Sequence, residues 1–139
     1  MRRDRDWAWA RFAEARVARL ATVSAAGAPR LVPIVFAVTG ERLITAVDHK
    51  PKSTTRLARL DDIAANPAVA LLVDEYDEDW TQLWWARADG RASVHDSFDI
   101  APLVAKYPPY ADRPPAGPVI VVEVARWTGW SAADSLTGG

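Results

Sequence analysis

The chain has 139 residues and a mass of 15.2 kDa, with 17 basic and 18 acidic residues, a net charge of −1 and no cysteine. This length predicts one domain over residues 1–139, and the balanced charge argues against nucleic-acid binding. The lack of cysteine excludes disulfides, thiolate catalysis and cysteine-ligated metal centres. The longest apolar run, residues 31–38, falls short of the roughly 20 residues of a membrane-spanning helix. No secretory signal is visible, so we expect a cytoplasmic protein without membrane contact.

The N-terminal half predicts a helix followed by an antiparallel meander. The expected elements are a helix over 6–15 capped by Asp6, strands over 17–24, 31–39 and 42–48, and a helix over 53–65. Gly27 and Pro29 supply a turn between the first two strands. Pro33 lies inside the second strand and has no N–H, so its nitrogen is expected to face a sheet edge, a bulge or a ligand.

The C-terminal half continues the same pattern. The expected elements are strands over 69–73, 80–88, 91–95 and 119–126, a helix over 97–107 capped by Ser97 or Asp99, and a proline-rich excursion or loop over 108–118. Asp89 and Gly90 predict a bend or hairpin between two of these strands. Together the elements indicate a mostly β protein with short helices (α+β), built as a small closed or partly closed barrel.

The most informative stretch is residues 48–56, where cations and hydroxyls fall between a strand and the first turn of a helix. Helix N-termini present unpaired N–H groups and a partial positive charge, which favours a bound phosphate. The candidate phosphate ligands are Lys50, Lys52, Ser53, Thr54 and Arg56. The alternative interpretation is a solvated loop with an ordinary capping serine.

Three tryptophans cluster on or beside the strand predicted over 80–88, at positions 80, 84 and 85. Adjacent strand residues point to opposite faces, so Trp84 and Trp85 cannot both enter one core. One of them is expected to pack inside, and the other to face a partner subunit, a flat ring ligand or solvent-side packing. Alternatively, helices of the same chain cover both.

No sequence motif identifies a catalytic residue or a metal site. The acidic run 74–79 does not fit an EF-hand, and no nucleophile elbow, P-loop or dinucleotide-binding glycine motif occurs. Two histidines, His49 and His95, leave little material for a metal centre, and neither belongs to a recognisable triad.

From residue 12 to about residue 130 the chain resembles the pyridoxamine-phosphate-oxidase-like split-barrel flavoproteins. The resemblance rests on the order of ARLATV strand, glycine–proline turn, LVPIVF strand and HKPKSTTRL segment, followed by DWTQLWWARADGRA. The last stretch is most similar to the actinobacterial branch of deazaflavin-dependent (coenzyme F420) oxidoreductases. The segment KPKSTTRL is one residue longer than the K-x-x-N-L form common in that family.

The resemblance implies an FMN-binding-like split barrel that forms a homodimer with two cofactor sites at the subunit interface. It assigns the cofactor phosphate to Lys50, Lys52, Ser53 and Arg56. It assigns the ring system to the backbone at Val32, Pro33 and Ile34, and closure of the site to Trp84 or Trp85 of the neighbouring subunit.

Three functions follow as hypotheses. The first is an oxidoreductase that moves hydride from reduced coenzyme F420 to a small enone- or imine-like acceptor, and it requires no acid–base residue because the cofactor carries the chemistry. Extra cations, such as Arg30, Lys50 and Arg56, favour the long anionic tail of this cofactor. The second is an FMN-dependent enzyme on the same barrel. The third is a non-catalytic cofactor carrier or a haem-binding protein, for which His49 or His95 is the available axial ligand.

Overall fold

A computed structural model of the chain describes residues 1–47 and 58–132. In chain order the elements are β1 (Arg2–Arg3), α1 (Arg5–Glu14), β2 (Ala18–Val23), β3 (Pro29–Ile34), β4 (Ala37–Thr39), β5 (Arg42–Ala46), α2 (Ala58–Ala65), β6 (Ala68–Glu75), the 3-10 helix η1 (Trp80–Gln82), β7 (Trp84–His95), α3 (Ala101–Lys106), α4 (Pro108–Asp112) and β8 (Val119–Ser131). All strand pairs are antiparallel. None of these helices is long and apolar enough to cross a membrane.

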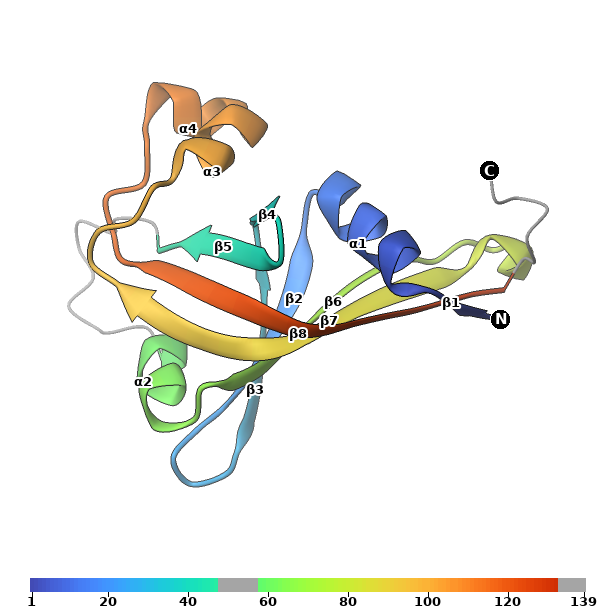
Figure 1. The fold of residues 1–139 in the computed structure, drawn as a ribbon, viewed down its shortest axis with the longest axis horizontal. Helices are drawn as coiled ribbons and strands as arrows, with labels where there is room; N and C mark the ends of the chain where they lie inside the picture. The colour runs from blue at the N-terminus through green and yellow to red at the C-terminus, as the bar shows by residue number, and fades with distance from the viewer. Residues whose placement is uncertain (48–57, 133–139) are drawn as a thin grey trace.

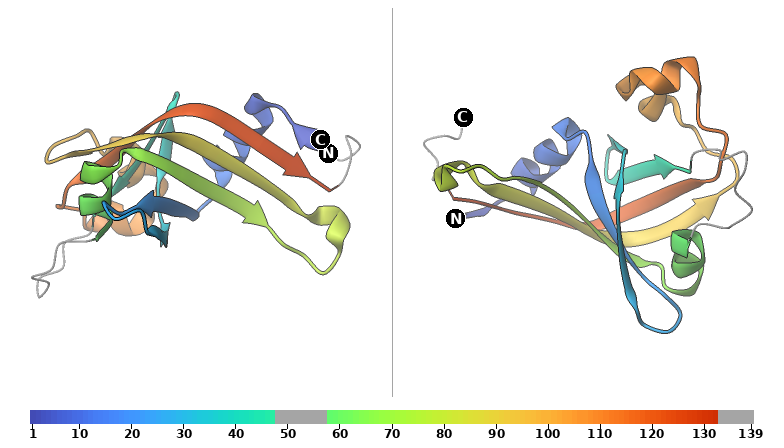
Figure 2. Two further views of the ribbon diagram at one scale, coloured as in Figure 1. Left: turned by 90° about the horizontal axis from the view of Figure 1, so that it is seen from below. Right: turned by 180° about the vertical axis from the view of Figure 1, so that it is seen from behind.

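The strands form a coiled sheet in the order β3-β2-β6-β7-β8-β5-β4, with β1 beside β8. Strands β7 and β8 run the length of the molecule, and α3 and α4 lie at the end far from the N-terminus (Figure 1). Helix α1 packs against β8 and β7, and α2 packs against β2 and β7. The coiling of the sheet is visible from below and from behind (Figure 2). The predicted mostly β split-barrel architecture with short helices is confirmed.

The core lies inside this coiled sheet and is centred on an aromatic cluster. Phe12 of α1 is fully buried, and its ring meets the rings of Phe36 and Trp127 edge-on, with centroid distances of 5.9 and 5.5 Å. Alternate residues of β2 and β6 complete the core, as expected for strands with one buried face. These residues are Ala18, Leu20, Val69, Leu71 and Val73.

The strand predicted over 31–39 is two strands, because the chain crosses from one end of the sheet to the other. β3 pairs with β2, whereas β4 pairs with β5. The break falls at Val35 and Phe36, where the backbone takes its hydrogen bonds from the α3 region instead of from a strand. The Phe36 N–H donates to the Tyr107 hydroxyl (3.1 Å), and the Phe36 carbonyl accepts from the Lys106 ammonium (2.9 Å) and lies 2.9 Å from the Tyr107 hydroxyl.

Of the hairpin or bend predicted at Asp89 and Gly90, the hairpin is wrong, since β7 continues through both residues. The register of β7 with β8 shifts there, from Asp89 opposite Arg126 to Gly90 opposite Val124. Such a bulge bends a strand without ending it. A side chain at Gly90 would overlap the Glu123 carbonyl oxygen, so this close approach of the two backbones requires glycine.

The remaining differences concern the ends of elements. Helix α1 is capped by Asp4, whose carboxylate accepts from the Trp7 N–H (2.9 Å), and not by Asp6. Residues 80–82 form the 3-10 helix η1 and not the start of a strand. Helix α3 begins only at Ala101, with Ile100 at the N-cap position in place of Ser97 or Asp99; the Asp99 carboxylate nevertheless accepts from the Ala101 N–H (2.9 Å), as expected of a capping side chain. Five residues of the proline-rich stretch form α4.

Lys106 predicts a pH dependence of stability. Burial lowers the pKa of its ammonium to about 8, and the charge of Arg16 acts in the same direction. An unfolded chain keeps the ordinary value of 10.5, so between these two values the unfolded state binds more protons and stability rises with pH. We expect the free energy of unfolding of the wild type, relative to Lys106→Met, to increase from about pH 7.5 to about pH 9.5 in urea titrations. A difference that falls over this range contradicts the assignment.

Candidate functional site

The candidate site is built around the free edge of β3. Among residues 1–47 and 58–132, this strand pairs only with β2, at one end of the sheet. The Ser24 N–H donates to the Ala28 carbonyl (2.9 Å). In an antiparallel hairpin, hydrogen-bonded and non-hydrogen-bonded residue pairs then alternate along the two strands. The alternation directs the backbone groups of Pro29, Leu31 and Pro33 away from β2. Because proline has no N–H, this edge offers three carbonyls and a single donor, the Leu31 N–H.

The three predicted ring-binding residues lie on this strand but face different ways. Val32 packs against the core and Ile34 is buried, whereas Pro33 is exposed on the opposite face. A flat ligand beside β3 would therefore meet the backbone and the Pro33 ring, and not the side chains of Val32 and Ile34. The predicted edge position of Pro33 is confirmed.

A buried carboxylate joins α2 to the β2–β3 hairpin. Asp62 has a side chain that is 4% exposed; it accepts from Arg30 Nε of β3 (2.7 Å) and from the Thr22 hydroxyl of β2 (2.8 Å). The hydrogen bond from Arg30, followed by that from Thr22, lowers the pKa of Asp62 below its ordinary value. Arg30, which the sequence suggested as an extra cation for an anionic cofactor tail, is thus compensated by an internal carboxylate.

The predicted phosphate ligands lie outside the described residues. They are Lys50, Lys52, Ser53, Thr54 and Arg56, and His49 lies in the same stretch. Helix α2 begins at Ala58, directly after this stretch in the sequence. The prediction for these residues therefore stays a prediction.

Trp84 and Trp85 point to opposite faces of β7, as predicted. Trp84 packs against the core and meets the Trp7 ring edge-on at 5.9 Å. Trp85 lies on the outer face, opposite Trp130 of β8 in register, with the Arg87 guanidinium 5.8 Å from its ring centroid. Both side chains are half-buried. Trp85 is therefore the one available to an outside partner from the outer face of the sheet.

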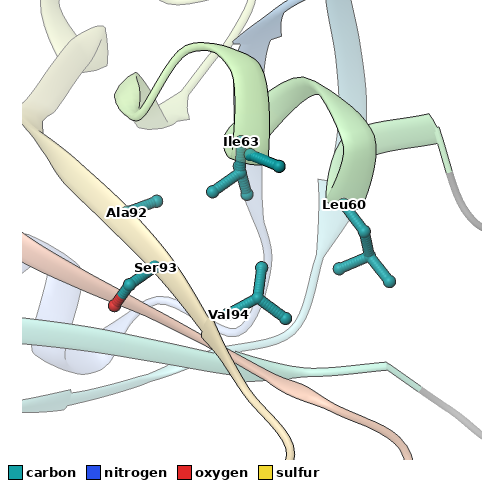
Figure 3. Close-up of a pocket in the computed structure, with 6 residues that line it drawn as sticks. Leu60, Ile63, Ala92, Ser93 and Val94 are labelled. Carbon is teal, nitrogen blue, oxygen red and sulfur yellow. The ribbon is translucent and has the colours of Figure 1, made fainter.

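A pocket of about 380 Å³ lies between α2 and the end of β7 (Figure 3). Its described lining residues are Leu60, Ile63, Ala64, Ala92, Ser93 and Val94. None of them is charged, and the one hydroxyl, on Ser93, lies 2.8 Å from His95 Nε2. The sequence alone does not indicate this pocket, because it forms only where α2 lies against the distant end of β7. A pocket of this kind suits an apolar group.

The outer face of the β2–β3 hairpin carries exposed apolar side chains. Leu31 is 67% exposed and Val23 37%. Some of the charged side chains on the same sheet face form ion pairs with each other. Arg19 lies 3.6 Å from Asp74, and Arg87 lies 2.9 Å from Asp89. Protein–protein interfaces commonly combine exposed apolar side chains with charged side chains that already have partners, and this face shows both features.

The coiled antiparallel sheet, its free β3 edge and its flanking helices define a split-barrel protein. Residues 8–131 match the family model described as pyridoxamine 5'-phosphate oxidase, and the chain belongs to this family. A comparison with curated proteins found no match.

Solved structures with the same fold have different described ligands. A conserved hypothetical protein from Mycobacterium tuberculosis has a TM-score of 0.76 at 16% identity, covering 97% of this chain and 88% of its own. An FAD-binding protein from Mesorhizobium loti has a TM-score of 0.69 at 17% identity, covering 93% and 95%. The haem storage protein HutZ from Vibrio cholerae has a TM-score of 0.66 at 16% identity, covering 88% and 89%. At these identities the likeness shows the fold and not the ligand.

Proposed function

We propose that the protein is an oxidoreductase that uses reduced coenzyme F420, with FMN as the alternative cofactor, to reduce a small unsaturated organic molecule. The observation that carries this proposal is the free edge of β3. Pro33 lies on this edge, and the Leu31 N–H is its single backbone donor. The family membership and the FAD-binding neighbour support a flavin-type cofactor. Two lysines precede α2 in the sequence, Lys50 and Lys52. They favour coenzyme F420 over FMN, because its long tail carries more negative charge than the single phosphate of FMN.

The chain's own residues bind and orient the reactants in this proposal. Lys50, Lys52, Ser53, Thr54 and Arg56 hold the phosphate by charge and hydrogen bonds. The edge of β3 receives the ring along Val32, Pro33 and Ile34. When bound, the deazaflavin would supply hydride from its C5 atom, and the anion left on the acceptor would take its proton from water, so the chain needs no dedicated acid–base pair. Correct placement of donor and acceptor in such reactions contributes about 7–11 kcal/mol in favourable cases.

We propose that the functional unit is a homodimer with the cofactor sites at its interface. The exposed side chains of Leu31 and Val23 lie on the outer sheet face that also carries Trp85. A second copy on this face covers the apolar surface without leaving Arg19 or Arg87 unpaired, since each has a carboxylate within the chain. In this arrangement Trp85, and not the core-packed Trp84, closes the partner's site.

The acceptor in this proposal is uncharged and partly apolar, such as an enone or an imine. In this proposal the pocket between α2 and the end of β7 is the acceptor site, since α2 also contacts β3 through Asp62 and no charged side chain is among the pocket's described lining residues. A charged acceptor would lose hydration there without a compensating partner.

Titration of the purified protein with coenzyme F420 and with FMN, followed by fluorescence, tests the proposal. We expect Lys52→Ala to weaken cofactor binding by about 1.5–3 kcal/mol, or roughly 10- to 150-fold, because a charge-assisted contact to phosphate is lost. Arg91→Ala removes an exposed cation elsewhere on β7 and is expected to leave the affinity unchanged. Equal affinity of wild type and Lys52→Ala contradicts the phosphate assignment. Binding of neither cofactor to the wild type contradicts the function.

Haem binding is the second candidate, favoured by the likeness to HutZ. Within the described residues its imidazole ligand would be His95, whose Nε2 is 2.8 Å from the Ser93 hydroxyl and whose ring lies 5.3 Å from that of Phe98. A haem ligand at this nitrogen has to displace the serine. A Soret band that is lost in His95→Ala would support haem over the flavin-type cofactor.

A further inference from the structure

We infer that Asp62 is a positioning residue that fixes the edge strand β3, so that the proposed ring-binding edge is already in place before a ligand arrives. The inference rests on the proposed function, because that function assigns the edge to a cofactor ring. It concerns a residue of α2 whose side chain faces the strands from the inside and does not reach the edge itself.

Asp62 contacts both strands of the hairpin at one pair of facing residues. Thr22 of β2 and Arg30 of β3 are opposite each other in register, and Asp62 accepts a hydrogen bond from both. Arg30 stands between Pro29 and Leu31, two of the three residues whose backbone groups face the free edge. The carboxylate therefore holds the part of that edge nearest the hairpin turn against a helix.

A second contact from the same region reinforces the hold. Asn66, just after α2, donates through its side-chain amide to the carbonyl of Ser24 (2.9 Å) and lies 3.3 Å from that of Val23. The turn end of the β2–β3 hairpin is thus tied to the α2 region at two neighbouring places. An edge strand that pairs on one side only is otherwise prone to fray or to slip in register.

The chemistry of Asp62 favours a role in orienting β3 over a role in holding α2 on the barrel. A well-packed apolar residue in place of a buried ion pair is often neutral or stabilising, so burial of a carboxylate is not needed to hold a helix on a barrel. A carboxylate with two oxygens does fix direction, because Arg30 donates both Nε (2.7 Å) and a second nitrogen (3.4 Å) to it. Asp62→Asn keeps the size and replaces one acceptor by a donor that faces the guanidinium.

Hydrogen exchange of the unliganded protein is the first test. In Asp62→Asn we expect the amides of Arg30 and Val32, which bond to β2, to exchange at least about tenfold faster, while those of Val121 and Val122 in β8 keep their wild-type rates. Thr22→Val removes the second donor to the carboxylate and is expected to give a smaller change in the same amides. A uniform acceleration across β3 and β8, or no acceleration, overturns the inference.

Ligand binding is the second test, with FMN and riboflavin as probes that share a ring and differ in the phosphate. Asp62→Asn is expected to raise the Kd of both by the same factor, about tenfold, whereas Lys52→Ala raises only the Kd of FMN. The core variant Ile120→Val, which lowers stability from a strand that pairs with β5 and β7 and not with β3, is expected to change neither. Unchanged riboflavin affinity in Asp62→Asn overturns the inference. A wild type that binds neither these probes nor coenzyme F420 instead overturns the proposed function, and the exchange test still decides the role of Asp62.

Discussion

Truncation of Phe12 to alanine is expected to lower the free energy of unfolding by about 3–5 kcal/mol. The Phe12 side chain is fully buried where α1 meets the inside of the sheet, and two aromatic rings contact it edge-on. Its removal leaves a cavity lined in part by the rings of Phe36 and Trp127. A small domain has only about 5–15 kcal/mol of net stability, so much of the barrel would unfold at moderate urea concentrations.

Urea denaturation followed by tryptophan fluorescence measures this loss, and Phe98→Ala is its control. Phe98 is half-buried and packs at the edge of the smaller cluster beneath α3. The loss for Phe98→Ala is therefore expected to be clearly smaller. A loss below about 1 kcal/mol for Phe12→Ala would show that α1 is not part of the barrel core.

Replacement of Leu31 by arginine is expected to dissociate the proposed homodimer and to abolish cofactor binding with it. Leu31 is 67% exposed on the outer face of β3, between the two prolines of the free edge. An unpaired charge buried in an interface costs about 3–5 kcal/mol, which corresponds to more than about 100-fold in the dimer dissociation constant. The fold of the subunit should not change, because the side chain points away from the core.

Sedimentation equilibrium over a range of concentrations measures the dissociation, in parallel with FMN and coenzyme F420 titrations. Ala105→Arg is the matched control, since Ala105 is exposed on α3, which packs against β4 at the end of the sheet opposite β3. It is expected to remain as dimeric as the wild type. A wild type that sediments as a monomer, or a Leu31→Arg variant that remains dimeric, rules out this face as the interface.

Local patterns predicted most of the strands and the family. Apolar runs bounded by turn residues located β2 and β6 to within two residues of their ends, and the missing N–H of Pro33 led to three alternatives that included the sheet edge on which it lies. The opposite directions of Trp84 and Trp85 followed from the two-residue repeat of a strand. These features depend on neighbours along the chain, so a single sequence is sufficient to read them.

The errors arose where a distant segment decides the local conformation. The break at Phe36 exists because β3 and β4 join different ends of the sheet and because Tyr107 and Lys106 bond the freed backbone. The continuity of β7 through Gly90 exists because β8 runs alongside and absorbs the shift in register. Neither partner can be identified from the residues at the break.

The sequence alone indicated a small, mostly β chain that resembles the split-barrel class, with a proline at a sheet edge, a bulge or a ligand and two tryptophans on opposite faces of one strand. Only the tertiary structure decided which strand edge stays open, which tryptophan faces outward, and that Asp62 lies buried between Thr22 and Arg30. The physical reason is that periodicity and backbone chemistry act over a few residues, whereas sheet order and burial of a charge depend on pairings between segments tens of residues apart.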